Sequence, residues 1–295
     1  MTLPSIGGFR IHSLETGFLW LDGGSMFGSV PKPLWSREHP ADERNRIRLA
    51  MRCLLLEGSG RLILVDDGVG EKFSPKLADI YRLEQHEQGL ERALARIGRS
   101  VEEVTDVVLT HLHFDHAGGS TKRDGDRLLP RLPRARYYVQ KRNLENARHP
   151  NPRERASYLP ENFEPLVSAG VLTLWDGPSN PWPGVEIFTA DGHTRGQQLV
   201  RVHGDEGAVY FVADLVPTGS HVRIPYVMGY DVAAIETMEE KRALLTRATS
   251  ERAWICLEHD PAIAFARPEV EGDDFKWGER IAAEAPPVPL PAERR

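Results

Sequence analysis

Short apolar runs separated by glycine, proline and polar residues predict a chain rich in strands with a few helices. Early strands are expected at 8–21, 48–58 and 61–68. Later strands are expected at 105–109, 134–140, 171–175, 185–190, 197–204, 207–214 and 253–260. Apolar residues at helical spacing predict helices at 87–98, which ends at Gly98, and at 233–248.

The order of these elements predicts how they pack. Two blocks of strands, each followed by helices, with polar residues at the strand ends, favour an α/β layered sandwich. No linker divides the chain, so residues 1–295 are expected to form one domain. The Pro-rich segment at about 283–295 is expected to be an irregular tail.

One loop stands apart because it is long and yet contains large apolar side chains. Residues 23–46 are rich in glycine and proline but include Met26, Phe27, Leu34 and Trp35. Loops of this length in compact domains are usually functional or disordered, and the apolar side chains argue against disorder. The loop is therefore expected to pack, to line a site, or to form an interface between copies of the chain.

Composition excludes several classes of protein. The 295 residues are 40% hydrophobic and 27% charged, which is an ordinary globular mixture. The net charge of −6 gives no support to a nucleic-acid surface. No signal peptide or membrane span is expected, so the prediction is a cytoplasmic protein without a membrane partner. Cys53 and Cys256 lie in apolar runs and are expected to be buried thiols, because two cysteines cannot form a disulfide scaffold.

The strongest chemical signal is the segment Thr110-His111-Leu112-His113-Phe114-Asp115-His116-Ala117-Gly118-Gly119. Its four candidate ligands directly follow an apolar strand, where burial without a partner would be costly and a metal ion would supply one. His111 and His113 can point at one centre, while Asp115 and His116 face a second. The two glycines let the backbone turn closely beneath the site.

Three more candidate ligands stand at the ends of other apolar strands. His193 follows the strand at 185–190, Asp214 ends the strand at 207–214, and His259 lies near the end of the strand at 253–260. A single histidine at a strand end is more often structural, but the repeated placement indicates a common edge. The full set of five histidines and two aspartates suits two divalent cations, zinc first, with manganese, cobalt or iron as alternatives.

With this set of residues the chain resembles the metallo-β-lactamase-fold hydrolases over nearly its whole length. The resemblance rests on the motifs LVDDG, THLHFDHAGG, GHTRGQ, FVADL and EHD in that order. It implies a four-layer αββα sandwich with one metal on His111, His113 and His193. It also implies a second metal on Asp115, His116 and His259, with Asp214 bridging both ions. By the same resemblance Asp66 would orient a ligand histidine, although the residues alone equally allow a turn aspartate before Gly68.

Two further segments, GGSMFGSVPKPLW and DLVPTGSHVRIPYVMGYD, look like those of the members that include quorum-quenching N-acyl-homoserine lactonases. Those lactonases carry a tyrosine three residues after the bridging aspartate, where this chain has Pro217. Other side chains are then needed around the substrate, or else these residues are ordinary packing. The candidates for the substrate pocket are Met26, Phe27, Trp35, His221, Tyr226 and Tyr230.

The resemblance implies a hydrolase in which a hydroxide bridging two metals opens a lactone or ester. Asp115 and Asp214 would be its catalytic residues, with Asp115 passing a proton. A phosphotriester or arylester hydrolase would use the same ligands. An iron-bearing redox protein and a non-catalytic metal-binding protein are alternatives of different classes. Relatives are often dimers, so the apolar loop at 23–46 could instead form a homodimer interface.

Overall fold

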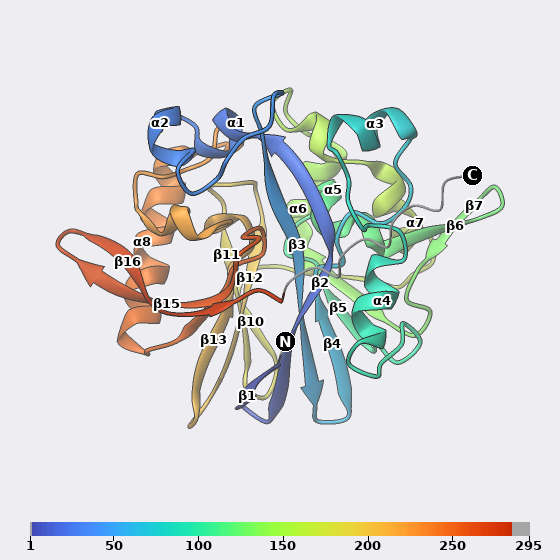
Figure 1. The fold of residues 1–295 in the computed structure, drawn as a ribbon. Helices are drawn as coiled ribbons and strands as arrows, with labels where there is room; N and C mark the ends of the chain where they lie inside the picture. The colour runs from blue at the N-terminus through green and yellow to red at the C-terminus, as the bar shows by residue number, and fades with distance from the viewer. Residues whose placement is uncertain (1, 285–295) are drawn as a thin grey trace.

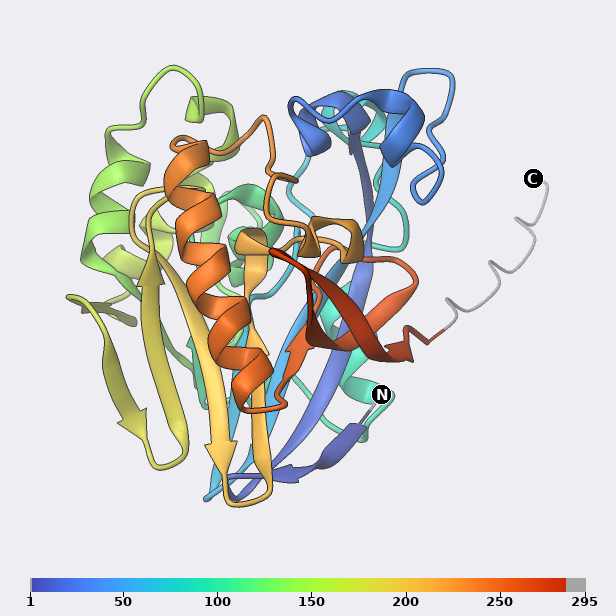
Figure 2. The same ribbon diagram turned by 90° about the vertical axis from the view of Figure 1, so that its left-hand side faces the viewer.

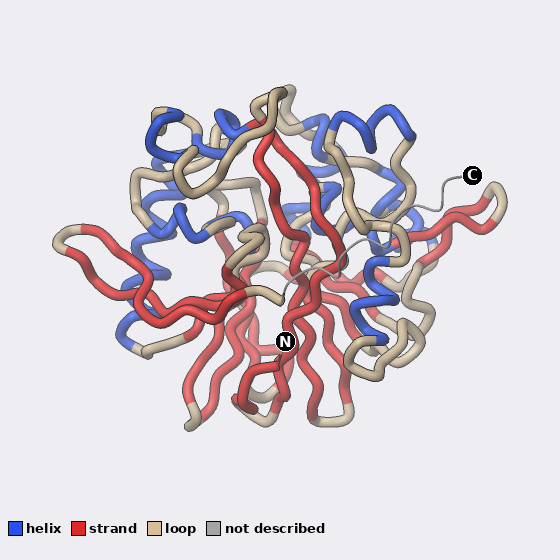
Figure 3. The backbone as a smooth tube through the Cα atoms, in the orientation of Figure 1, coloured by secondary structure: helices blue, strands red, loops and turns tan. Residues whose placement is uncertain are grey.

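A computed structural model describes residues 2–284 and places two large β-sheets face to face between outer helices (Figures 1 and 3). Each sheet has seven strands. The first has the order β1-β2-β3-β4-β5-β8-β9. Its strands are β1 (Thr2–Ile6), β2 (Phe9–Asp22), β3 (Arg46–Gly58), β4 (Arg61–Val65), β5 (Asp106–Val108), β8 (Arg136–Gln140) and β9 (Leu172–Trp175).

The second sheet follows chain order from β10 to β16. Its strands are β10 (Ser179–Trp182), β11 (Val185–Ala190), β12 (Gln197–Gly204), β13 (Gly207–Phe211), β14 (Trp254–Cys256), β15 (Ile263–Glu271) and β16 (Asp274–Ala282). A separate hairpin is formed by β6 (Thr121–Asp124) and β7 (Arg127–Pro130). Strands β13 and β14 run parallel, and β11 points the same way because two antiparallel steps separate it from β13.

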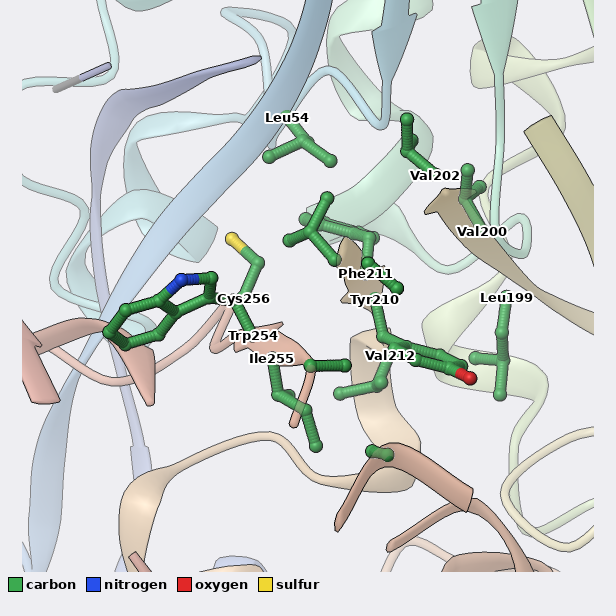
Figure 4. Close-up of a cluster of buried hydrophobic side chains, with 14 of the residues drawn as sticks. Leu54, Leu199, Val200, Val202, Tyr210, Phe211, Val212, Trp254, Ile255 and Cys256 are labelled. Atoms are coloured by element: carbon green, nitrogen blue, oxygen red, sulfur yellow. The ribbon is translucent and has the colours of Figure 1, made fainter. Parts of the chain in front are cut away.

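The continuous apolar runs reflect strands that are buried on both faces. In β3, Leu54 and Leu56 pack into the core between the sheets, whereas Cys53 and Leu55 pack toward the helices on the other face. Figure 4 shows Leu54 approaching side chains of the second sheet. Strand β3 is antiparallel to both neighbours, but its sheet is covered on both faces, so its apolar residues run on without alternation. Both cysteines are buried and unpaired, as predicted.

Helices cover the outer faces of the two sheets. Side chains of α4 (Gly89–Ala95), α6 (Lys141–Arg148) and α7 (Glu164–Ser168) pack on the first sheet. The long helix α8 (Ala234–Ser250) crosses the second sheet and contributes Leu244, Leu245 and Ala248 to the main core (Figure 2). These layers make the αββα sandwich that the family resemblance implied.

Most predicted elements are present. The strands at 185–190 and 197–204 have the predicted limits, and others are shifted, shortened or extended at their ends. The predicted helix at 87–98 ends earlier, and Gly98 has φ +71°, which suits its role as a helix stop. The loop at 23–46 contains α1 (Gly23–Phe27) and α2 (Lys32–Trp35), and α3 (Pro75–Ile80) and α5 (Phe114–Ala117) are further short helices. The hairpin β15–β16 was not predicted. Most of the expected tail lies outside the described residues. Across 2–284, no helix is long and apolar enough to cross a membrane.

Candidate metal centre

The seven candidate ligands meet at one edge of the two sheets. They follow the carboxyl ends of four strands: β5 leads to His111, β11 to His193, β13 to Asp214 and β14 to His259. Each of the seven side chains is at least nine-tenths buried. Because β11, β13 and β14 point the same way, their ends lie together against the loop that follows β5.

That loop is held close to the backbone beneath it by glycine. A Cβ added to Gly118 would lie 2.2 Å from the Val69 carbonyl oxygen, and one added to Gly119 would lie 2.2 Å from that of Asp67. Since contacts this short do not occur, a side chain at either position would push the loop away. The expected role of the two glycines is therefore met by the structure.

One group of ligand atoms is formed by His111, His113, His193 and Asp214, all within 4.8 Å of one another. The His113 Nδ1 and His193 Nε2 atoms are 3.3 Å apart. Asp214 Oδ2 lies 3.0 Å from His193 Nε2 and 3.8 Å from His111 Nε2. These nitrogens and the carboxylate oxygen converge on a point as metal ligands do.

A second group of ligand atoms is formed by Asp115, His116 and His259, again within 4.8 Å. His116 Nε2 and His259 Nε2 are 3.3 Å apart. Asp214 Oδ1 lies 3.0 Å from His259 Nε2, and its Oδ2 lies 3.5 Å from His116 Nε2. Asp214 therefore reaches both groups, which is the position of a bridging carboxylate.

The residues present fit metal ions because some of their buried polar atoms lack a hydrogen-bond partner within residues 2–284. His111 Nε2 and Asp214 Oδ1 are buried without a hydrogen-bond partner among the described residues. Burial, together with the neighbouring histidines, holds the pKa of His111 well below its usual value, so its imidazole is neutral. An orphaned buried polar group is costly, and a divalent cation would satisfy these atoms.

Three histidines donate from the outward nitrogen to groups that can only accept. His116 Nδ1 donates to Asp66 Oδ2 at 3.0 Å, and His193 Nδ1 donates to Asp231 Oδ1 at 2.9 Å. His259 Nδ1 donates to the Ala50 carbonyl oxygen at 2.8 Å. The proton on Nδ1 leaves the inward Nε2 with a free lone pair, which is the arrangement that orients histidine ligands of metals.

Asp66 also connects a fourth histidine to this network. Its carboxylate accepts hydrogen bonds from the backbone N–H and the hydroxyl of Thr110, at 2.7 and 2.6 Å. The Thr110 oxygen can then accept from His111 Nδ1 at 3.1 Å, which leaves His111 Nε2 free. Asp66 has φ +56°, a strained conformation for a non-glycine residue that is often found at functional sites.

His113 faces a carboxylate that the sequence did not single out. Glu154 Oε2 lies 3.9 Å from His113 Nε2. Glu154 is buried and also accepts hydrogen bonds from Asn146 and Thr194, both at 2.8 Å. The ring of Tyr158 packs edge-on against His113 at 4.7 Å. These contacts position His113 from its outer side.

Carboxylates control the charge of the histidines when no cation is bound. Burial lowers the pKa of His193, but Asp214 and Asp231 more than offset this and raise it to about 10. In the same way, Asp214 outweighs burial and raises the pKa of His259 to about 9. The histidines in turn hold the pKa of Asp214 well below its usual value, although burial opposes them. Without a cation, the carboxylates of the site therefore favour protonated, positively charged histidines.

Another carboxylate, Glu258, lies behind His116. Its Oε1 is 3.2 Å from His116 Nδ1, and the side chain is fully buried. Burial raises the pKa of Glu258 to about 8, although His116 opposes this shift. No pattern in the sequence selects Glu258, Glu154 or Asp231, since the role of each depends on contacts between distant segments.

A cavity of about 140 Å³ opens beside the candidate ligands. Of the six predicted pocket residues, Met26 and Tyr230 line it. The lining also contains residues that the sequence analysis did not select, namely Leu21, Tyr81, Phe114, Arg153, Glu154, Ala156, Ser157 and Met228. Tyr81 lies near enough to Asp115 for the carboxylate to add to the effect of burial in raising the tyrosine pKa.

The structure places the other four predicted pocket residues outside this lining. Phe27 is fully buried and stacks on Trp35 and on His221, with ring centroids 5.4 and 4.7 Å apart. Tyr226 meets Phe27 edge-on at 6.3 Å. These rings form a small core under the loop at 23–46, so their role is packing. Arg195, in the GHTRGQ motif, pairs with Glu236 at 2.8 Å.

Comparison with known proteins agrees with this geometry. An N-acyl homoserine lactonase of Bacillus cereus is 26% identical over 174 residues, covering 56% of this chain and 63% of that protein. A probable metallo-hydrolase of Mycobacterium tuberculosis is 26% identical over 236 residues, covering 69% of this chain and 72% of that protein. The chain thus spans less than two thirds of the lactonase's length.

Solved structures share the fold over nearly the whole chain. A probable metal-dependent hydrolase from Staphylococcus aureus aligns with a TM-score of 0.87 and 27% identity, covering 96% of this chain and 99% of that one. A dizinc quorum-quenching lactonase bound to a product aligns with a TM-score of 0.76, over 94% and 96% of the two chains. At 18% identity, this second likeness shows the fold alone.

The sequence model for the metallo-beta-lactamase superfamily matches residues 52–259. This region holds every candidate ligand, from the 111–116 motif to His259. The match covers well over half of the chain and ends at the last candidate ligand, His259. The chain therefore belongs to the metallo-beta-lactamase superfamily.

Proposed function

We propose that this protein uses two divalent cations to open a lactone or an ester. The position of Asp214 carries the proposal, because its carboxylate lies 3.0 Å from His193 Nε2 in one group and 3.0 Å from His259 Nε2 in the other. Zinc suits five imidazole and two carboxylate donors without cysteine, and manganese, cobalt or iron would fit the same donors. Lactonases among the relatives support lactones as the first substrates to test.

The residues divide the work between the two positions. His111, His113 and His193 would hold one cation, Asp115, His116 and His259 the other, and Asp214 both. When bound, such cations activate a water molecule for attack and polarise the carbonyl oxygen. Asp115 lines the cavity and can take up and release a proton during attack.

The lactonases carry a tyrosine at the position of Pro217. In this chain Tyr81 is the residue best placed to assist the leaving oxygen instead. It lines the cavity, and its hydroxyl makes no hydrogen bond to any residue that the structure describes. Tyr230 also lines the cavity, and burial raises its pKa, although the neighbouring Ser25 opposes this shift. Burial and Asp115 raise the pKa of Tyr81, so its phenol keeps the proton that it would donate.

A substrate panel tests the proposal. Zinc-loaded protein should open γ-butyrolactone and cleave p-nitrophenyl acetate, and Asp214→Ala should lower both rates by more than 100-fold. Asp205→Ala, at an exposed turn far from the site, serves as the matched control and should keep both rates. If paraoxon is the preferred substrate, the protein is a phosphotriesterase. If Asp214→Ala retains full activity, the proposal is wrong.

A further inference from the structure

The cavity beside the candidate ligands is small for a ligand site. Its volume is about 140 Å³, and a protein cavity of ~150 Å³ holds a single benzene-sized ring. Sites for larger molecules usually occupy about 300–1,000 Å³. The cavity therefore has room for a reacting carbonyl group and only a few more atoms.

Two methionines form part of the apolar wall of the cavity. Met26 comes from α1 and Met228 from the segment before α8, and they are 1% and 3% exposed. Their two segments are joined by a hydrogen bond from the Gly229 N–H to the Ser25 carbonyl oxygen at 2.7 Å. The Met26 carbonyl oxygen also accepts from His221 Nε2 at 2.9 Å. This apolar wall is thus held in place by backbone contacts.

A third segment, the loop at 149–158, is hydrogen-bonded to the segment that carries Met228 at the rim of the cavity. The Arg153 guanidinium donates to the carbonyl oxygen of Gly229, so the loop at 149–158 is tied to the segment that carries Met228. Both partners of this contact come from segments that line the cavity. Removal of this contact would release the segment that carries Met228 from the loop at 149–158.

We infer that the site selects compact lactones and esters, whose acyl part has only a few carbon atoms, and that Met26 and Met228 set this limit. The inference rests on the proposed hydrolase function and narrows its substrate class. Long-chain acyl esters, and N-acyl homoserine lactones with long acyl chains, would then be poor substrates, because a cavity of about 140 Å³ has no room for the chain.

A chain-length series measures this limit directly. With zinc-loaded protein, we expect kcat/KM to fall along the series p-nitrophenyl acetate, butyrate and octanoate. The value for octanoate should be at least tenfold below that for acetate. A channel that buried the chain would instead raise kcat/KM about fourfold for each methylene. A steady rise along the series would therefore overturn the inference.

Binding gives a second readout that does not depend on turnover. Calorimetric titration with acetate, butyrate and octanoate should show affinity that stays level or weakens with chain length. Tightening from acetate to octanoate would overturn the inference. If no ester or lactone is cleaved at all, the proposed function fails, and this titration still decides the size limit.

Substitutions in the wall test which residues set the limit. Met26→Ala should raise the octanoate-to-acetate ratio of kcat/KM at least tenfold by enlarging the cavity. Leu34→Ala, at a 46% exposed position on α2, is the matched control and should keep the original ratio. If Met26→Ala does not fold, Arg153→Ala at the exposed rim should raise the ratio as well. An unchanged ratio in the folded variants would refute the assigned role.

Discussion

Asp231 offers the sharpest test of how the ligands are positioned, because it touches a candidate ligand but faces away from the cations. One carboxylate oxygen accepts from His193 Nδ1 at 2.9 Å, and the other accepts from the Met228 N–H at 3.0 Å. The side chain is 4% exposed, so water cannot easily replace either contact. Asp231→Asn keeps the shape but leaves one oxygen for two N–H donors.

The expected loss of zinc affinity follows from the number of N–H donors left without an acceptor. Whichever way the amide turns, one N–H faces the NH₂ group, and an unsatisfied buried donor costs ~1–3 kcal/mol. This corresponds to roughly 5- to 150-fold in an equilibrium constant. Loss of the carboxylate partner of a ligand histidine typically weakens metal binding about 10- to 100-fold. We therefore expect zinc affinity to fall about 10- to 100-fold.

Competition against a chromogenic chelator at fixed pH measures this affinity. Asp191→Asn is the matched control. Asp191 lies on the same loop as His193, and its carboxylate accepts a hydrogen bond from the Gly196 N–H at 2.7 Å without touching a candidate ligand. The control should bind zinc as the native protein does. Native zinc affinity in folded Asp231→Asn would refute the claim that this contact orients His193.

Three other predictions concern leaving groups, stability and pH. Tyr81→Phe should slow alkyl esters about 100-fold but spare p-nitrophenyl esters, whose leaving group needs no proton, and Tyr226→Phe should change neither rate. Lys241→Met should lower the free energy of unfolding in urea by ~3–5 kcal/mol, because the buried ammonium donates to three backbone carbonyls at 2.6–3.1 Å. Without metal, the pKa values of His193 and His259 are raised from 6.5 to about 10 and about 9. Stability should therefore be full below pH 6.5 and fall as the pH rises to about 10. Thermal unfolding with and without zinc checks this, since bound cations replace those protons and should remove the decline.

The sequence was informative where the chemistry is local or lies at a strand end. The motif from His111 to His116 is contiguous, and the apolar strands before His193, Asp214 and His259 mark those positions. The order of the strands also predicted the layered sandwich. Each of these signals depends on residues that are close in the chain.

Contacts between distant segments were not predictable in the same way. Asp231 and Glu154 matter only because tertiary packing brings them to His193 and His113. An apolar side chain in a long loop fits a core and a pocket equally well by pattern. For that reason Met26 and Phe27 received the same prediction, although Met26 lines the cavity and Phe27 is buried in the small core.

The central claim is that the seven side chains hold two neighbouring cations, and metal counting tests it most directly. Elemental analysis of protein dialysed after zinc loading should give about two zinc ions per native chain. His259→Ala should retain about one, because it removes a ligand from only one of the two groups. One ion or none in the native protein, or two ions retained in His259→Ala, would contradict this account.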